Sequence, residues 1–258
     1  MSGFAWRNDG GPPLLHWTAA PPGVRAAFSS RAGGVSGGPW SSLNLGLRTG
    51  DDRERVLENR RLLCGGAGVD PAHARCLHQV HGRRVRRADD LRGSFAETGS
   101  SAIGDALWTE RAARGLVAFG ADCLTVVIAR VDGSRIAAAH AGWPGLLAGL
   151  LERAAAVVDG GSGIPVVAAI GPSASPTSYE VGLDVATPLV ERFGKAAVRR
   201  GHADLWFCGT TALRSAGVVR VDVAGLCTIA DDRFFSHRRT GLPRGVQGVV
   251  AHLEEVGG

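Results

Sequence analysis

The chain has 258 residues, of which 45% are hydrophobic and 21% are charged, and its formal net charge is +5. These values are typical of a globular protein with a full-sized core, and they exclude a disordered chain or a fibrous repeat. Lys195 is the only lysine, so the positive charge is almost entirely arginine. A genome rich in G and C would explain this bias, and anion recognition is the alternative, because guanidinium groups suit phosphate.

Nucleic-acid and membrane partners are not expected. The run Arg83–Arg92 mixes arginines with acids and has no interleaved aromatic residue, which is typical of a solvated edge. No apolar run approaches the ~20 residues that cross a bilayer, and Met1–Trp17 lacks the features of a signal peptide. The five cysteines are scattered and form no C-x-x-C pair, which suits a reducing compartment. We therefore expect a cytoplasmic protein.

The N-terminal part predicts a strand, a turn and a helix. Val24–Ser29 is apolar enough for a short strand and leads into the glycine-rich turn Arg31–Ser36. Asp51–Leu63 carries its acids early and apolar residues on one side, which indicates a helix. Gly93–Gly104 is rich in small polar residues and is predicted to be a surface loop.

The middle of the chain predicts buried strands followed by a helix. Leu116–Phe119, Leu124–Ala129 and Arg135–Ala139 are apolar runs that fit strands. Pro144 is expected at the first helical position, where its missing N–H costs nothing. The helix is predicted to continue through Gly145–Val158 and to end at Gly160.

The C-terminal part predicts a strand at Val166–Ile170, a loop at Gly171–Ser178, a helix at Asp204–Ser215 and a final strand at Gly248–Leu253. Strands and helices are thus mixed along the chain without strict alternation. No linker divides the chain, so we predict one α+β domain over residues 1–258, with layered mixed sheets flanked by helices.

Three metal-capable side chains follow or end apolar segments: His81, Cys123 and His140. Imidazole nitrogen and thiolate sulfur are preferred zinc ligands, and a catalytic zinc takes three protein ligands and leaves a fourth position open. A water bound there loses its proton near pH ~7. Any one of these side chains alone is more often a packing residue than a ligand.

Many short segments, in one order along nearly the whole chain, resemble the laccase-domain family. This family is known under the names polyphenol oxidase, purine nucleoside phosphorylase and peptidoglycan editing factor. The similar segments are Ser29–Ser36, Ser42–Gly46, Glu58–Arg60, Gln79–Gly82, Gly104–Ala106, Ala121–Cys123, His140–Trp143, Ile170–Pro172, Tyr179–Gly182 and Phe234–Arg239.

The resemblance implies that His81, Cys123 and His140 bind zinc. It also implies phosphorolysis of adenosine, inosine, guanosine and methylthioadenosine, together with deamination of adenosine. The implied fold is an α+β arrangement of layered mixed sheets related to toxin-like cysteine deamidases. Two positions depart from the family pattern, because Pro144 replaces an arginine that usually follows HAGW and Thr125 replaces a proline. The lost arginine removes one potential phosphate contact.

Four residues in the family-like segments are candidate substrate contacts. Arg31 and Arg60 are expected to bind phosphate, since arginine forms bidentate pairs with phosphate oxygens, and a surface or structural salt bridge is the alternative for each. Asn44 and Gln79 are expected to orient base or ribose, with a loop-fixing role as the alternative. Asp122 is interpreted as an anchor beside Cys123 rather than a general base, because on a strand it would point to the other face.

Three rival functions stay open from sequence. A copper polyphenol oxidase is one, although the chain has eight histidines and no H-x-H pair, and copper could also bind at the same site. A metal-free cysteine hydrolase, with Cys123 as nucleophile and His140 as base, or a hydrolase that edits peptidoglycan precursors, is the second. A non-catalytic interaction protein is the third. We expect a monomer or a small homo-oligomer whose partners are a purine nucleoside and phosphate.

Overall fold

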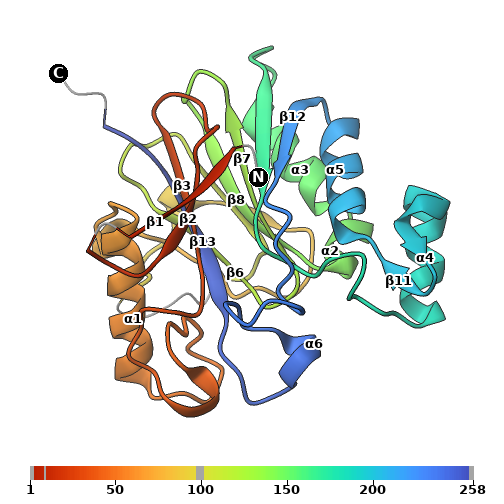
Figure 1. The fold of residues 1–258 in the computed structure, drawn as a ribbon. Coiled ribbons are helices and arrows are strands. Elements are labelled where there is room, and N and C mark those ends of the chain that lie inside the picture. Colours follow the sequence, from red (N-terminus) through yellow and green to blue (C-terminus); the bar gives the residue numbers. More distant parts are fainter. Residues whose placement is uncertain (1–2, 9, 97–101, 256–258) are drawn as a thin grey trace.

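A computed structural model describes residues 3–8, 10–96 and 102–255. Two sheets face each other across a shared core, and helices cover the outer side of each sheet (Figure 1). The core between the sheets contains apolar residues from strands of both, including Phe28, Leu116 and Val127. The α+β prediction of layered sheets flanked by helices is confirmed.

The first sheet is antiparallel throughout, with the strand order β1-β2-β3-β13-β6. Its strands are β1 (Phe4–Arg7), β2 (Leu14–Trp17), β3 (Val24–Ser29), β6 (Leu116–Gly120) and β13 (Gln247–Leu253). The helix α1 (Arg53–Gly66) covers its outer face through a cluster that includes Leu63 and Val250. β13 therefore joins the N-terminal strands to β6.

The second sheet is mixed, with the order β12-β9-β7-β8-β5-β4 and parallel pairing only at β12/β9 and β4/β5. Its strands are β4 (Val85–Arg87), β5 (Ala106–Thr109), β7 (Leu124–Arg130), β8 (Ile136–Ala141), β9 (Val166–Ile170) and β12 (Val218–Val223). Every residue of β7 is buried, because Leu124, Val126 and Ile128 face the helices while Val127 and Ala129 face the other sheet. A strand covered on both faces reads as a continuous apolar run.

The helices beside the second sheet are α2 (Trp143–Leu147), α3 (Leu150–Asp159), α4 (Leu183–Phe193) and α5 (Leu205–Ser215). The short helix α6 (His237–Thr240) comes between β12 and β13 in the chain. The short strands β10 (Val198–Arg199) and β11 (His202–Ala203) pair with each other. The remaining elements are 3-10 turns at Gly38–Trp40, Pro71–His73, Ala88–Asp90 and Lys195–Ala197.

One predicted helix was wrong in its continuity. The expected helix Gly145–Val158 is divided into α2 and α3, because Gly149 adopts a left-handed conformation with φ 78°. Pro144 occupies the second helical position rather than the first, since Trp143 begins α2. The predicted end at Gly160 is confirmed, with φ 52° at that residue.

The predicted strands at Val24–Ser29 and Val166–Ile170 are confirmed with the same bounds. The expected helix at Asp204–Ser215 is α5, with Asp204 as its N-cap. The surface-loop prediction for Gly93–Gly104 was wrong at Ser94, Phe95 and Ala96, which are buried, because Phe95 packs into the cluster under α1. Residues 97–101 of that segment lie outside the described residues.

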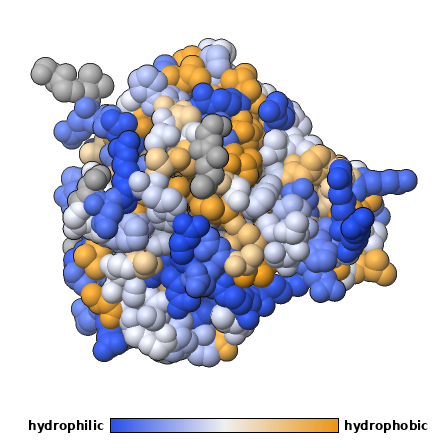
Figure 2. Space-filling view, in the orientation of Figure 1, coloured by the Kyte–Doolittle hydropathy of each residue, from blue (hydrophilic) through white to orange (hydrophobic). Residues whose placement is uncertain are grey.

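Across the described residues, none of the helices is both long enough and apolar enough to span a membrane. On the face shown in Figure 2, hydrophilic residues gather in the lower middle, where Figure 1 places α6. The exposed residues of this helix are His237, Arg238, Arg239 and Thr240.

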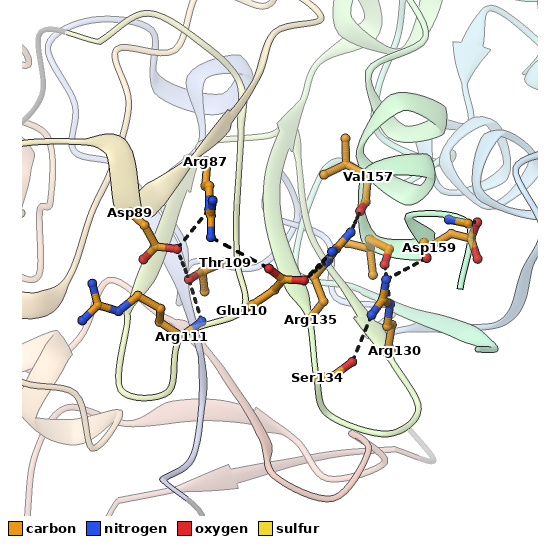
Figure 3. Close-up of polar contacts among 12 residues, drawn as sticks. Arg87, Asp89, Thr109, Glu110, Arg111, Arg130, Ser134, Arg135, Val157 and Asp159 are labelled. Atoms are coloured by element: carbon orange, nitrogen blue, oxygen red, sulfur yellow. Dashed lines mark hydrogen bonds and ion pairs between the residues drawn. The ribbon is translucent and has the colours of Figure 1, made fainter. Parts of the chain in front are cut away.

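Arg130, the last residue of β7, and Arg135, which directly precedes β8, bind the C-terminal end of α3 (Figure 3). Arg130 donates to the carbonyl oxygens of Val158 (2.7 Å) and Asp159 (2.8 Å), and Arg135 donates to that of Val157 (2.6 Å). The last carbonyls of a helix have no partner within it and carry partial negative charge, so these guanidinium groups satisfy both needs. At these positions arginine has a structural role.

Candidate metal centre

His81, Cys123 and His140 come together from three different segments. His81 lies in the loop before β4 with φ 57°, Cys123 lies in the turn between β6 and β7, and His140 is in β8. One ligand atom from each lies within 4.8 Å of the other two, and Cys123 Sγ is 3.8 Å from His81 Nε2. The two imidazole rings meet edge to face with centroids 4.7 Å apart. His140 is 4% exposed, whereas His81 is exposed and Cys123 is half-buried.

This arrangement fits a tetrahedral metal ion. Zinc bound by two imidazoles and a thiolate needs ligand atoms about 3.3–3.6 Å apart, so side-chain shifts of about 1 Å would close the sphere. The exposure of His81 leaves one side of the group open to solvent. The three residues therefore suit a site with three protein ligands and one open position.

Gly142 makes the approach of the ligands possible. A Cβ atom at this position would lie 2.8 Å from His81 Cδ2 and 2.9 Å from Cys123 Sγ. Both distances are shorter than ordinary van der Waals contacts. A side chain at position 142 would therefore displace two of the three ligands.

Asp105 is a functional residue that the sequence reasoning missed. Its carboxylate accepts hydrogen bonds from the backbone N–H groups of Val80 (3.1 Å), His81 (2.9 Å) and Gly82 (2.8 Å). It also lies 3.0 Å from His140 Nδ1, so this nitrogen donates to Asp105 and Nε2 faces the centre. One buried carboxylate thus orients two ligands, and the only signal in the sequence was its place in the family-like segment Gly104–Ala106.

The electrostatics of the centre favour a thiolate. Burial opposes ionisation of Cys123, but hydrogen bonds and charge from His140 and His81 outweigh it and lower the pKa of the thiol. Burial likewise opposes protonation of His140, yet Asp105 and Cys123 raise its pKa. The pKa of Asp105 is lowered, because its hydrogen bonds to His140, Gly82 and Val80 exceed the effect of burial. Thiolate is the form of cysteine that binds metals and acts as a nucleophile.

Asp122 has the contacts of an anchor. It is buried, its Oδ1 accepts from Thr228 Oγ1 (2.7 Å), and its Oδ2 accepts from the backbone N–H of Arg238 (2.7 Å). It lies in the turn before β7 with φ 93°, not on a strand as expected. The turn that carries Cys123 is thereby tied to α6.

The four candidate substrate contacts do not come together in one place. Arg60 and Gln79 line a cavity of about 490 Å³ beside α1, which also includes Arg48, Arg53 and His78. Arg31 lines a separate cavity of about 140 Å³ beside α6. Their roles in substrate binding stay predictions.

Each of the four already has protein partners. Arg60 is buried and donates to the carbonyls of Leu45 and Phe95, and Gln79 forms two hydrogen bonds with the backbone of Phe119. Asn44 is buried and holds the 44–51 loop through Thr49 and Asp51. Arg31 donates to the carbonyl of Ser41 (2.7 Å). These contacts fit the loop-fixing alternative for Asn44 and Gln79. Arg60 is held by carbonyl oxygens rather than by a salt bridge, and Arg31 keeps further donors.

Two more side chains, Tyr179 and Arg244, lie within electrostatic reach of Cys123. Burial raises the pKa of Tyr179, and the charge of Cys123 raises it further. The Arg238 guanidinium stacks 4.8 Å from the Tyr179 ring centroid. Burial lowers the pKa of Arg244, whereas the charges of Asp122 and Cys123 raise it. The phenol of Tyr179 and the guanidinium of Arg244 therefore lie near the centre, and Arg238 stacks on that phenol.

Comparison with known proteins gives one family. Residues 25–254 match the family described as multi-copper polyphenol oxidoreductase laccase. A protein of Xylella fastidiosa named purine nucleoside phosphorylase is 43% identical over 85% of this chain and 88% of its own length. Purine nucleoside phosphorylase YfiH of Escherichia coli is 36% identical over 85% of this chain and 90% of its own length.

Solved structures show the same fold. YlmD from Geobacillus stearothermophilus superposes with a TM-score of 0.88 at 28% identity, over 98% of this chain and 99% of that one. A Neisseria meningitidis protein superposes with a TM-score of 0.81 at 30% identity, over 98% of this chain and all of that one. The arrangement of two sheets and outer helices is thus shared along almost the whole chain.

Proposed function

Because the chain belongs to the family described as multi-copper polyphenol oxidoreductase laccase, with relatives named purine nucleoside phosphorylase, we propose that it is a zinc-dependent purine nucleoside phosphorylase. We propose adenosine, inosine, guanosine and methylthioadenosine as substrates, and deamination of adenosine as a second activity. The observation that carries the proposal is the convergence of His81, Cys123 and His140 within 4.8 Å.

In this proposal His81 Nε2, Cys123 Sγ and His140 Nε2 hold the ion. A bound zinc would supply a Lewis acid at its open position. Asp105 keeps the proton on His140 Nδ1, so that Nε2 presents its lone pair. Asp105 also holds the His81 loop by its three backbone hydrogen bonds. Arginine side chains near the centre would bind and orient the phosphate nucleophile.

A single mononuclear site is the reason to prefer this function over polyphenol oxidation. Among the described residues, His81, Cys123 and His140 form the one group of three or more His, Cys, Asp or Glu side chains that could hold a metal. A multicopper oxidase needs several copper ions in separate sites. Copper bound at the same three ligands is a possible substitution that metal analysis would reveal.

The deciding experiment compares the wild type with Cys123→Ala. Protein purified without added copper is expected to contain about one zinc per chain and to release hypoxanthine from inosine only when phosphate is present. Cys123→Ala removes the thiolate and is expected to lose both metal and activity. Cys208→Ala, which changes a buried cysteine of α5, is the matched control and should retain both. Full phosphorolysis by Cys123→Ala would contradict the proposal.

Deamination is tested with adenosine in the absence of phosphate. The expected products are inosine and ammonia, with the same loss in Cys123→Ala. Phosphate-free incubation separates this reaction from phosphorolysis, because base release needs the phosphate nucleophile.

A metal-free cysteine hydrolase is a second candidate, and one observation favours it. The hydrogen bonds of Cys123 to His140 and His81 lower the pKa of its thiol, as in enzymes that use a thiolate nucleophile. This function predicts that activity survives chelation and is lost on alkylation of Cys123. The zinc proposal predicts loss on chelation and recovery when zinc is added.

A further inference from the structure

A small cavity beside α6 gathers arginine side chains from three segments. It has a volume of about 140 Å³. Arg31 follows β3, Arg239 is in α6, and Arg244 lies between α6 and β13. The other lining residues are Pro39, Phe235, Ser236, Thr240 and Pro243.

The three arginines differ in how many of their donors are already used. Arg239 donates to the carbonyls of Thr228, Ile229, Asp231 and Phe234, so its position is fixed by the backbone. Arg31 uses Nε for the Ser41 carbonyl and stacks 4.9 Å from the Phe235 ring centroid, which leaves its two terminal nitrogens.

Arg244 is unusual because its Nε is buried without a hydrogen-bond partner among the described residues. A buried donor without a partner costs free energy, so such groups are normally satisfied by the protein, by water or by a ligand. No ion pair of Arg244 is formed with the described residues either. An anion in the cavity would supply the missing acceptor.

The charge of the cavity is positive. The pKa of Arg31 is lowered first by burial and then by the charge of Arg239, and Asp232 offsets this in part. The positive charges of Arg31 and Arg239 are therefore close enough to repel each other. An anion with several oxygens would relieve this repulsion and could accept hydrogen bonds from two arginines at once.

The cavity lies on the Cys123 side of the metal centre. The backbone N–H of Arg238 in α6 donates to Asp122 Oδ2, and Asp122 directly precedes Cys123. Ser236 caps α6 by accepting from the N–H of Arg239, which fixes the helix that lines the cavity. The hydrophilic region in the lower middle of Figure 2 coincides with α6.

We propose that Arg244 and Arg31 bind the inorganic phosphate that attacks the nucleoside, with Arg239 adding positive charge from a fixed position. This inference rests on the proposed function. In the reaction, a phosphate oxygen forms a bond to ribose C1′ while the bond from C1′ to the purine nitrogen breaks. The electron pair of the broken bond leaves with the purine, which takes up a proton, and the products are ribose 1-phosphate and the free base.

The test uses Arg244→Gln and Arg31→Gln in the zinc-loaded protein, with inosine as substrate. Each loses a charged hydrogen bond, so the KM for phosphate should rise about 10- to 100-fold. The KM for inosine and the zinc content should stay close to wild type. Arg244→Lys should recover part of the loss, because it restores the charge but not the planar fork. Arg214→Gln, an exposed arginine at the end of α5, is the matched control and should behave as wild type.

Calorimetric titration with inorganic phosphate provides a readout that needs no turnover. Phosphate should bind the wild type and the Arg214→Gln control, and it should bind the two cavity variants more weakly by a similar factor. Two variants on different segments guard against one that fails to fold, which circular dichroism would detect.

The outcomes separate this inference from the proposed function. If the wild type shows phosphorolysis while both variants keep the wild-type phosphate KM and affinity, the cavity is not the phosphate site. If the wild type shows no phosphorolysis but the cavity variants lose phosphate binding, the site stands and the proposed function fails.

Discussion

At the scale of single residues, one carboxylate organises the candidate metal centre. Asp105 contacts the His81 loop through three backbone N–H groups and His140 through Nδ1. Ligand histidines that donate their second nitrogen to a carboxylate are oriented and made more basic by it. The geometry of two candidate ligands therefore depends on a residue that is not itself one of the three.

Asp105→Asn is expected to lower zinc affinity about 10- to 100-fold, because the neutral amide holds His140 and the His81 loop less strongly. Competition with a chromophoric chelator measures the change. Asp132→Asn, an exposed carboxylate in the β7–β8 turn, should leave the affinity unchanged. Equal affinities of wild type and Asp105→Asn would show that the carboxylate does not position the ligands.

Gly142→Ala adds one methyl group beside two ligands, at 2.8 Å from His81 and 2.9 Å from Cys123. The ligands must move apart, so we expect less than stoichiometric zinc although all three ligands are present. Gly65→Ala, where a Cβ meets nothing within 4 Å, is the control and should bind zinc normally. Zinc analysis after dialysis distinguishes the two, and full occupancy in Gly142→Ala would contradict the steric argument.

The grouping of the three candidate ligands could be expected from the sequence only with the family resemblance. His81, Cys123 and His140 are far apart in the chain and have no regular spacing, so their meeting depends on the fold. Asp105 was not predictable, because its function depends on the backbone conformation of residues 80–82 in a loop without periodic pattern. The unpaired Nε of Arg244 is likewise a property of tertiary packing.

At the scale of elements, burial on both faces made β9 predictable, since its residues Val166–Ile170 form an all-apolar run. β3 was predictable from its mostly apolar residues, which are buried except for Arg25. The break between α2 and α3 was not predictable, because apolar residues continue on both sides of Gly149 and only its left-handed backbone divides the helix. β12 was missed because it contains Arg220 and Asp222 and is an edge strand. Whether a strand lies at the edge depends on the order of all strands in the sheet, which the local sequence does not show.

The arginines that bind the end of α3 offer a test at this scale. Arg130→Met removes hydrogen bonds to two helix carbonyls, one buried and one partly buried, and is expected to reduce the free energy of unfolding by about 2–4 kcal/mol. Urea denaturation measures this loss. Arg153→Met, on the exposed side of the same helix, should change the free energy by less than about 0.5 kcal/mol.

Zinc affinity should not change in Arg130→Met, because Arg130 ends β7 at the end opposite to Cys123. If Arg130→Met lost zinc affinity as well as unfolding free energy, a change at one end of β7 would affect the candidate ligand at the other end. Wild-type stability in Arg130→Met would instead show that the carbonyls find other partners.

At the scale of the whole molecule, β13 links the first sheet to α1 through His252. This side chain is 7% exposed, and its Nε2 lies 3.1 Å from the carbonyl oxygen of Ala67, just after α1. Burial lowers the pKa of His252 more than its carbonyl contacts raise it. The folded state therefore favours the neutral imidazole.

Stability is expected to depend on pH through this residue. Below about 6.5, the ordinary pKa of histidine, the unfolded chain binds the proton more readily than the folded one. The contribution of neutral His252 is full above that pH and is lost as the pH falls toward the lower folded pKa. The excess of wild-type unfolding free energy over His252→Gln should thus shrink between pH 7.5 and pH 5, as urea titrations can measure. If the gap between wild type and His252→Gln instead widened on acidification, the expected sign would be wrong.

The central place of β13 also bears on how the protein is made. β13 is later in the chain than every other described strand, yet it lies between β3 and β6. A ribosome-bound nascent chain that lacks it would expose the unpaired edges of both neighbours, which are templates for aggregation. The first sheet can close only after its last strand has been synthesised, so its folding depends on contacts of long sequence separation.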